Sequence, residues 1–76
     1  MLKANPTAED LDAEEAAAEK EADPQKRAIV LAMIAVERNE RGLGNPQPAL
    51  RKARAAASLV SDSAERAQLL TRIADA

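Results

Sequence analysis

The sequence repeats itself when it is shifted by thirty-nine residues. Ten of the twenty-five aligned pairs from 11/50 to 35/74 are identical, and five of those identities are not alanine. The five are Leu11 with Leu50, Asp23 with Asp62, Arg27 with Arg66, Leu31 with Leu70 and Ile34 with Ile73. A period near forty residues is typical of stacked helix-turn-helix units, in which each unit buries a face that its neighbour cannot bury alone. The repeat therefore predicts an all-α protein of two helical hairpins.

The composition limits how stable such a protein is. The 76 residues allow a single domain, and the 46% of apolar residues include nineteen alanines and no aromatic residue. A core of small side chains predicts a free energy of unfolding at the low end of the usual range of about 5–15 kcal/mol. A small margin favours self-association, or folding that is coupled to a partner. The abundance of Ala, Arg and Glu is typical of a bacterial or phage source.

N-cap residues and prolines divide the chain into four predicted helices. After an N-terminal arm at 1–6, we expect helices at about 7–22, 24–41, 46–60 and 63–75. Asp23-Pro24 and Asn45-Pro46 each combine an N-cap residue with a proline that suits the first helical turn. Short connections predict antiparallel hairpins, with repeat units at about 7–42 and 46–76 of one four-helix domain.

Three further signals mark helix ends. Thr7 with Asp10, and Asp62 with Glu65, have the three-residue spacing of a capping box. Gly42 follows the second helix and is placed to adopt the left-handed conformation of a C-cap.

Apolar residues at helical spacing predict the buried faces. In the third helix they are Leu50, Ala53, Ala57 and Val60, with Leu59 beside them. In the fourth they are Ala67, Leu70, Ile73 and Ala74, with Leu69 alongside. Leu11 is the single large apolar residue of the first helix, so we expect that helix to be the least stable.

The residues at these spacings resemble degenerate tetratricopeptide-like repeats of bacterial proteins. The resemblance covers residues 11–75 and rests on Ile34-Ala35, Gly42, Ala49-Leu50, Ala53, Val60, Asp62, Arg66-Ala67, Leu70 and Ile73-Ala74. The aromatic signature positions of that family are empty here, and the period is thirty-nine residues where the family has thirty-four. The resemblance implies a helical-hairpin array that recognises proteins or peptides, and it implies no catalytic residue and no cofactor.

The second helix carries an apolar face that the fourth lacks. Ile29, Ala32, Met33 and Val36 align with Gln68, Thr71, Arg72 and Asp75. One interpretation is that the second helix is central and buries this face against its neighbours. The other is that Ile29, Met33 and Val36 form an exposed seam for self-association or for a partner, where the flexible side chain of Met33 suits an adaptable contact.

Charge is divided unevenly along the chain. Residues 1–23 hold eight acids and two lysines, whereas residues 24–76 hold nine bases and five acids. In the repeat alignment Asp12 is equivalent to Arg51 and Glu15 to Arg54. This pattern indicates either solvated helices with a modest mutual attraction or a surface at which Arg51, Lys52 and Arg54 steer an oppositely charged partner.

The sequence offers little chemistry for catalysis. It has no His and no Cys, its serines lie near helix ends without an activating base, and its acids do not follow a calcium-loop pattern. We therefore expect no enzymatic activity, cofactor, metal or small-molecule substrate. The longest apolar run, residues 28–36, is shorter than the roughly twenty residues of a membrane span, which predicts a cytoplasmic protein without a membrane partner.

Two functions remain at this point. The first is a protein-protein interaction module, a small adaptor or inhibitor that binds another protein or forms a homodimer. Its expected contacts are the apolar Ile29, Met33 and Val36 and the basic Arg51, Lys52 and Arg54. The alternative is a regulator that binds nucleic acid in the manner of a helix-turn-helix, through the basic third and fourth helices. Overall acidity and the lack of aromatic residues argue against that alternative.

Overall fold

The protein is an all-α bundle, as predicted. A computed structural model describes residues 7–75, which form α1 (Ala8–Glu19), α2 (Pro24–Arg41), α3 (Gln47–Ala57) and α4 (Ser63–Asp75), and it contains no strand in that range. The predicted N-terminal arm, residues 1–6, lies outside the described residues. Both α1 and α3 end three residues earlier than the sequence predicts, which lengthens the turns that follow them.

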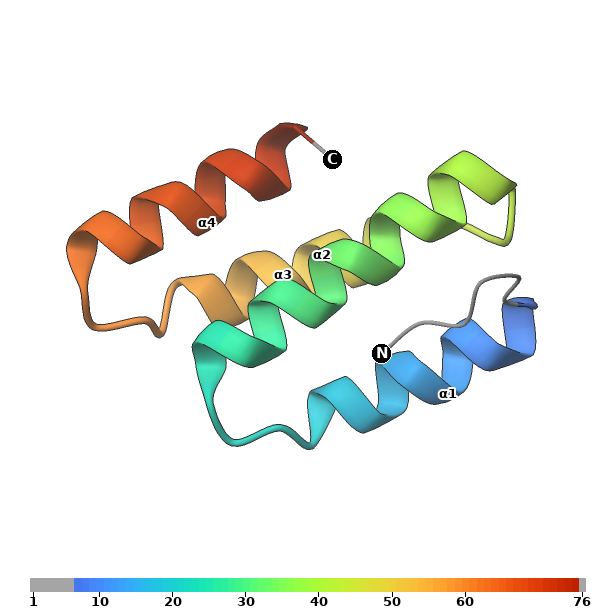
Figure 1. Ribbon diagram of the computed structural model, residues 1–76, viewed down its shortest axis with the longest axis horizontal. Coiled ribbons are helices and arrows are strands. Elements are labelled where there is room, and N and C mark those ends of the chain that lie inside the picture. The colour runs from blue at the N-terminus through green and yellow to red at the C-terminus, as the bar shows by residue number, and fades with distance from the viewer. Residues whose placement is uncertain (1–6, 76) are drawn as a thin grey trace.

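Helix α2 is the centre of the bundle. It contacts α1, α3 and α4, and α3 contacts α4 as well. Consecutive helices run in opposite directions, and α1 and α4 lie on the two sides of α2 (Figure 1). The most extensive contact joins α2 to α3, the helices on either side of the boundary between the two predicted repeat units.

Equivalent aspartates cap the second helix of each unit. The carboxylate of Asp23 accepts a hydrogen bond from the backbone N–H of Gln25 at 2.9 Å. At the equivalent position, Asp62 accepts from the backbone N–H of Glu65 at 3.0 Å. Each bond satisfies one of the N–H groups that a helix leaves unpaired at its start. The identity between these two residues in the repeat therefore has a local structural cause.

Equivalent arginines hold the two turns in the same way. The Nη1 of Arg27 donates to the backbone carbonyl of Glu21 at 2.8 Å, and the Nη1 of Arg66 donates to that of Val60 at 3.1 Å. Both bonds reach back six residues, and both partners occupy the same repeat position. The two turns therefore share a hydrogen-bonding scheme that the identity of Arg27 and Arg66 encodes.

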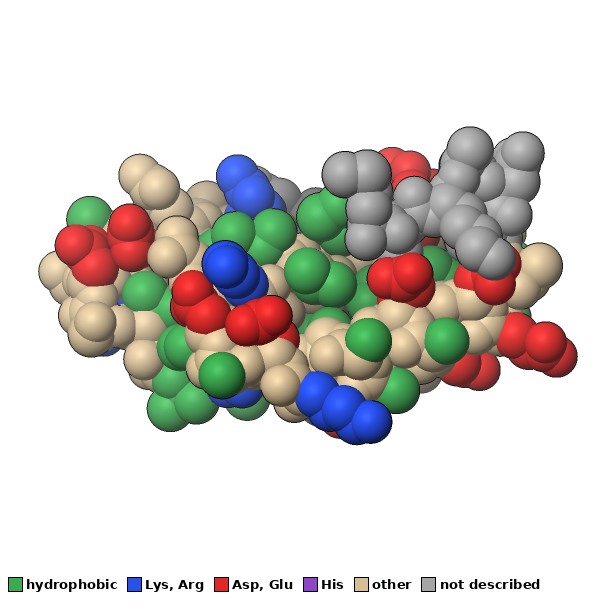
Figure 2. All heavy atoms as spheres, turned by 60° about the horizontal axis from the view of Figure 1, so that its bottom comes forward, with side chains coloured by type: hydrophobic (Ala, Val, Ile, Leu, Met, Phe, Trp, Pro, Cys, Tyr) green, Lys and Arg blue, Asp and Glu red, His purple; other side chains and the backbone are tan. Residues whose placement is uncertain are grey.

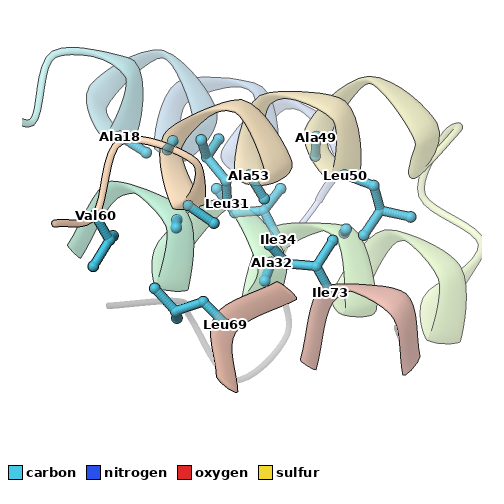
Figure 3. Packing of buried hydrophobic residues seen from close by; sticks show 14 of the residues in the cluster. Ala18, Leu31, Ala32, Ile34, Ala49, Leu50, Ala53, Val60, Leu69 and Ile73 are labelled. Carbon is cyan, nitrogen blue, oxygen red and sulfur yellow. The ribbon is translucent and has the colours of Figure 1, made fainter. Parts of the chain in front are cut away.

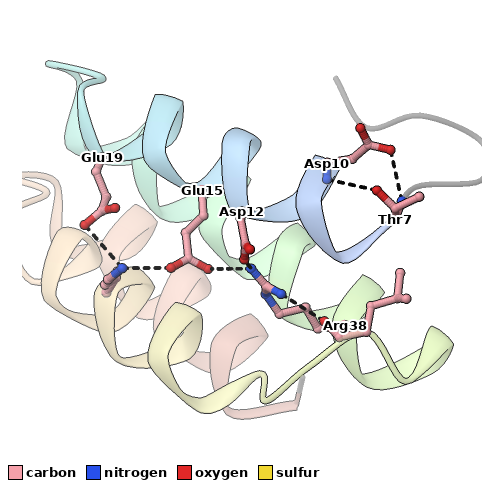
Figure 4. Close-up of polar contacts among 8 residues, drawn as sticks. Thr7, Asp10, Asp12, Glu15, Glu19 and Arg38 are labelled. Carbon is pink, nitrogen blue, oxygen red and sulfur yellow. Dashed lines mark hydrogen bonds and ion pairs between the residues drawn. The ribbon is translucent and has the colours of Figure 1, made fainter.

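The start of α1 is a complete capping box. Thr7 Oγ1 accepts from the backbone N–H of Asp10 at 3.1 Å, and the Asp10 carboxylate accepts from the backbone N–H of Thr7 at 3.0 Å (Figure 4). The predicted box is thus confirmed. It fixes the beginning of a helix whose own apolar face is narrow.

The end of α2 depends on the conformation of Gly42. This residue has φ 64° and ψ 35°, the left-handed geometry predicted for it. A Cβ at this position would meet no atom within 4 Å, so the cost of a side chain lies in the backbone alone. We expect Gly42→Ala to lower the free energy of unfolding by about 1 kcal/mol. Urea unfolding followed by circular dichroism measures this loss, and an unchanged stability would contradict the need for glycine here.

The core is built largely from alanine and a few aliphatic side chains (Figure 3). Leu11, Leu31 and Ile34 are its largest fully buried side chains. The other buried apolar residues are Ala18, Ala28, Ala32, Ala35, Ala49, Leu50, Ala53, Ala56, Ala57, Val60, Leu69 and Ile73. Alanines on facing helices allow close approach, but each removes little apolar surface from water.

The buried face of α4 differs from the predicted one. Leu69 and Ile73 are buried, Leu70 is half-buried, and Ala67 and Ala74 are exposed. The reason is the position of α4, which packs at the edge of the bundle against both α2 and α3. The apolar stripe therefore turns toward the gap between those helices, a direction that the repeat alignment with central α2 does not reveal.

Leu59 also lies elsewhere than predicted, because its side chain is 65% exposed. Helix α3 ends at Ala57, and the backbone N–H of Val60 then bonds to the carbonyl of that alanine at 3.1 Å. This tight turn directs Val60 into the core. Leu59 remains on the outside.

No helix within residues 7–75 is long and apolar enough to cross a membrane.

Candidate interaction surface

The additional apolar face of α2 is partly core and partly surface. Ala32 is 4% exposed and belongs to the core, whereas Met33 is 45% exposed. Ile29 and Val36 are half-buried. This face therefore packs inside the bundle at Ala32 and faces outward at Met33. We call Ile29, Val30, Met33 and Val36 the open face of α2, since Val30 is half-buried beside them.

Two grooves border the open face. The α1–α2 groove has a volume of about 350 Å³ and is lined by Glu14, Ala17, Ala18, Glu21, Lys26, Ile29 and Val30. The α2–α4 groove has a volume of about 150 Å³ and is lined by Gln25, Ile29, Glu65, Gln68, Leu69 and Arg72. Ile29 lines both grooves. The open face is therefore the strip of α2 left uncovered between its two flanking helices.

The rim of the α1–α2 groove carries more negative than positive charge. Glu14 and Glu21 stand on one side and Lys26 on the other. When the side of α1 is turned forward, acidic side chains outnumber basic ones at the surface, and hydrophobic side chains are visible between them (Figure 2). Glu14 is half-buried, and within residues 7–75 it forms no ion pair or hydrogen bond with another side chain. This groove therefore combines an apolar floor with an unneutralised acid.

The three basic residues predicted to steer a partner do not share one environment. Arg51 and Arg54 are exposed on α3, and within the described part of the chain neither forms an ion pair. Lys52 instead reaches α1, where its Nζ lies 2.7 Å from Glu15 Oε2 and 3.3 Å from Glu19 Oε1. Two of the three are thus available to a partner, and the third holds α1 against α3.

Sequence reasoning missed Arg38, the one buried charged residue among those described. It is 7% exposed, and its Nη2 lies 2.7 Å from Asp12 Oδ1 and 3.5 Å from Glu15 Oε1 (Figure 4). Its Nη1 donates to the backbone carbonyl of Leu43 at 2.9 Å. Arg38 therefore ties α2 to α1 and to the turn before α3.

A signal for Arg38 was present in the sequence. It follows Leu31 by seven residues and Ile34 by four, so it lies on the buried stripe of α2, where an arginine requires partners. Gly44 provides room for it: its φ is 104°, and a Cβ there would lie 3.1 Å from Arg38 Nη1. A side chain at Gly44 would crowd the guanidinium.

The ion pairs of Lys52 with Glu15 and Glu19 depend on pH. The hydrogen bond to Glu15 raises the pKa of Lys52 above its ordinary value of 10.5, and Glu19 adds to this effect while desolvation opposes it. Because the folded-state pKa is raised, the contribution of Lys52 is complete below pH 10.5 and is lost as pH rises through the folded-state value. It is less than about 1 kcal/mol, since the side chain is 39% exposed.

We therefore expect wild type to lose stability above pH 10.5 more steeply than Lys52→Met. The difference between their free energies of unfolding, measured at pH 8 and at pH 11.5, should shrink at the higher pH. Parallel curves for the two proteins would contradict this role of Lys52.

The geometry of possible metal ligands and the similarity to known proteins also bear on the function of this surface. No group of three or more His, Cys, Asp or Glu within the described residues is arranged to hold a metal ion. No protein-family model, no curated protein and no solved structure matches the chain at a significant level.

Proposed function

We propose that this chain is a non-catalytic protein-binding module, an adaptor or a small inhibitor, that contacts its partner through the open face of α2. The observation that carries the proposal is the exposure of Met33 near the middle of α2, the helix with the most large aliphatic residues, with Ile29 and Val36 half-buried beside it. Burying these side chains under a partner contributes roughly 25 cal/mol of favourable free energy per Å² of apolar surface removed from water. Hydrophobic patches bordered by polar residues typically mark interaction sites.

The proposal includes the architecture and the location. We infer a helical-hairpin array of the tetratricopeptide-like type in the cytoplasm. The N-caps at the equivalent Asp23 and Asp62, and the matching turn bonds from Arg27 and Arg66, support two related hairpins. Helical-hairpin arrays generally act by presenting surfaces to other macromolecules.

A site-specific cross-link tests the proposed face. Benzoylphenylalanine replaces Met33 in one variant and the exposed Ala16 of α1 in a matched control, and both are irradiated in an extract of the cells that make the protein. We expect an adduct with a defined protein at position 33 and none at position 16. Excess unlabelled wild type should reduce this adduct several-fold, whereas excess Met33→Glu should not.

Met33→Glu is an informative competitor because it should fold. The side chain is 45% exposed, so we expect its free energy of unfolding to stay within about 0.5 kcal/mol of wild type. Equal adducts at positions 33 and 16, or none at either, would contradict the proposed function.

Nucleic acid binding is the second candidate, and the exposed arginines of α3 favour it. Helix α3 contains no acidic residue, and Arg51 and Arg54 face solvent. Binding would raise the fluorescence anisotropy of a labelled DNA duplex at physiological salt. The double variant Arg51→Ala with Arg54→Ala would lose this increase. A weak affinity with a steep salt dependence in wild type would indicate non-specific phosphate attraction, because each neutralised phosphate releases a counterion.

A further inference from the structure

The chain carries both a groove and a surface that complements it. We propose that the partner of the α1–α2 groove is a second copy of this chain, which docks the outer face of its α3 there. This inference rests on the proposed function and names a partner for the edge of the open face, where Ile29 and Val30 line the groove. The outer face of α3 consists of Arg51, Arg54 and Ala55 together with Leu59 in the turn that follows.

The outer face of α3 has the chemistry that the groove requires. Leu59, with 65% of its side chain exposed, is the most exposed large hydrophobic residue among those described. Ala55 lies one helical turn before it and is also exposed. Arg51 and Arg54 lie on the same side of the bundle without ion-pair partners among residues 7–75. Ala55 and Leu59 border a shallow hollow of about 250 Å³ that Glu19, Arg27, Leu31, Lys52 and Ala56 also line. The surface thus combines exposed apolar side chains with two free positive charges.

The groove offers the opposite set. Its floor is apolar through Ala17, Ile29 and Val30, and its rim bears Glu14 and Glu21 against the single Lys26. Glu14 lies on α1 and Glu21 in the turn after it, and Arg51 lies on α3 and Leu59 in the turn after it, so each feature runs from a helix into the following turn. Complementary charge at such a contact raises the association rate and fixes the register.

The shape of the elements also favours a helix as the occupant. The described residues contain no strand whose edge an extended peptide could join, and the groove lies between two antiparallel helices. A helix laid in a groove is the recognition mode that such a surface supports. The apolar face of α3 is buried in its own bundle, so its outer face enters the groove with Ala55 and Leu59 as the apolar contacts.

Groove and outer face share no residue, so one copy can use both surfaces at the same time. It can do so with one partner about a two-fold axis or with two different copies. We therefore expect the solution mass to rise with concentration from that of the 8.1 kDa chain. The rise should weaken with added salt, because exposed charges are screened over about 10 Å at 0.1 M salt.

Two charge-reversal variants test the docking by light scattering with refractive-index detection. The groove variant is Glu14→Lys with Glu21→Lys, and the α3 variant is Arg51→Glu with Arg54→Glu. Each alone brings like charges together in every contact, so we expect each to remain at the monomer mass at concentrations where wild type associates. Mixed one to one, they restore opposite charges in every mixed contact, and we expect association to return.

A control separates these effects from net charge. Glu9→Lys with Glu40→Lys makes the same charge change at exposed positions outside the groove, and it should associate like wild type. Far-UV circular dichroism confirms that all variants fold. Wild type that stays at 8.1 kDa up to millimolar concentration, or variants that fail to associate when mixed, would overturn self-docking. Neither result bears on the cross-link at Met33, which tests protein binding independently.

Discussion

Leu11→Ala should release α1 from the bundle and cost about 3 kcal/mol of unfolding free energy. Leu11 is fully buried, and Ala18 is the other buried side chain of this helix. Truncating a buried leucine removes its transfer free energy and leaves a cavity, with typical losses of about 2–5 kcal/mol. Urea unfolding followed at 222 nm gives the total loss, and hydrogen exchange locates it. We expect the amides of α1 to exchange much faster, with smaller changes in α2 and α3.

Leu59→Ala is the matched control for that substitution. It removes the same atoms from a side chain that is 65% exposed, so its cost should stay below about 0.5 kcal/mol. If the two leucines proved equally tolerant of truncation, Leu11 would not be the apolar anchor of α1. If exchange accelerated equally in all helices, α1 would unfold with the rest of the bundle as one unit.

The parts of the fold that depend on local rules were predictable. Asp23 with Pro24, the Thr7 capping box and Gly42 each act on neighbouring backbone, so their residue types and spacing determine their roles. The all-α class follows from these signals together with helical periodicity. Helix ends were less predictable, because the alanine-rich last turns of α1 and α3 contain no residue that marks where the helix ends.

The parts that depend on distant neighbours were not predictable in the same way. Leu69 and Leu70 are identical, adjacent residues, and the arrangement of α2 and α3 determines which of them is buried. Lys52 lies between Arg51 and Arg54 in a basic stretch, yet it turns toward Glu15, thirty-seven residues away. The sequence could name the basic residues of the candidate site, whereas the separation of the free Arg51 and Arg54 from the engaged Lys52 required the structure.

Arg38 holds the middle of α1 by charge, next to the apolar contact that Leu11 makes with the core. Its guanidinium bonds to Asp12 on α1, to Glu15 one turn later and to the carbonyl of Leu43. Asp12 is 70% exposed and regains water readily if the bond is lost, whereas Glu15 is 13% exposed and does not. The cost of removing the arginine therefore lies mainly with Glu15 and with the carbonyl of Leu43.

Arg38→Met should lower the free energy of unfolding by about 2–3 kcal/mol. Removing one member of a buried ion pair typically costs about 3–5 kcal/mol, and the exposure of Asp12 together with the remaining bond from Lys52 to Glu15 reduces that figure here. Methionine keeps the apolar stem, so the loss reports the charge and its hydrogen bonds. Urea unfolding measures it, and hydrogen exchange should again show faster exchange in α1.

Arg41→Met is the control for that change. Arg41 pairs with Glu37 one turn earlier in the same helix, and its side chain is 42% exposed, so we expect a loss below about 0.5 kcal/mol. Equal losses in the two variants would mean that Arg38 contributes no more than a surface pair. A large loss for Arg38→Met that persists in 1 M salt would instead show a buried network, because salt screens exposed pairs far more than buried ones. Arg38 would then contribute about as much as Leu11 to the stability of the packing of α1 against the bundle.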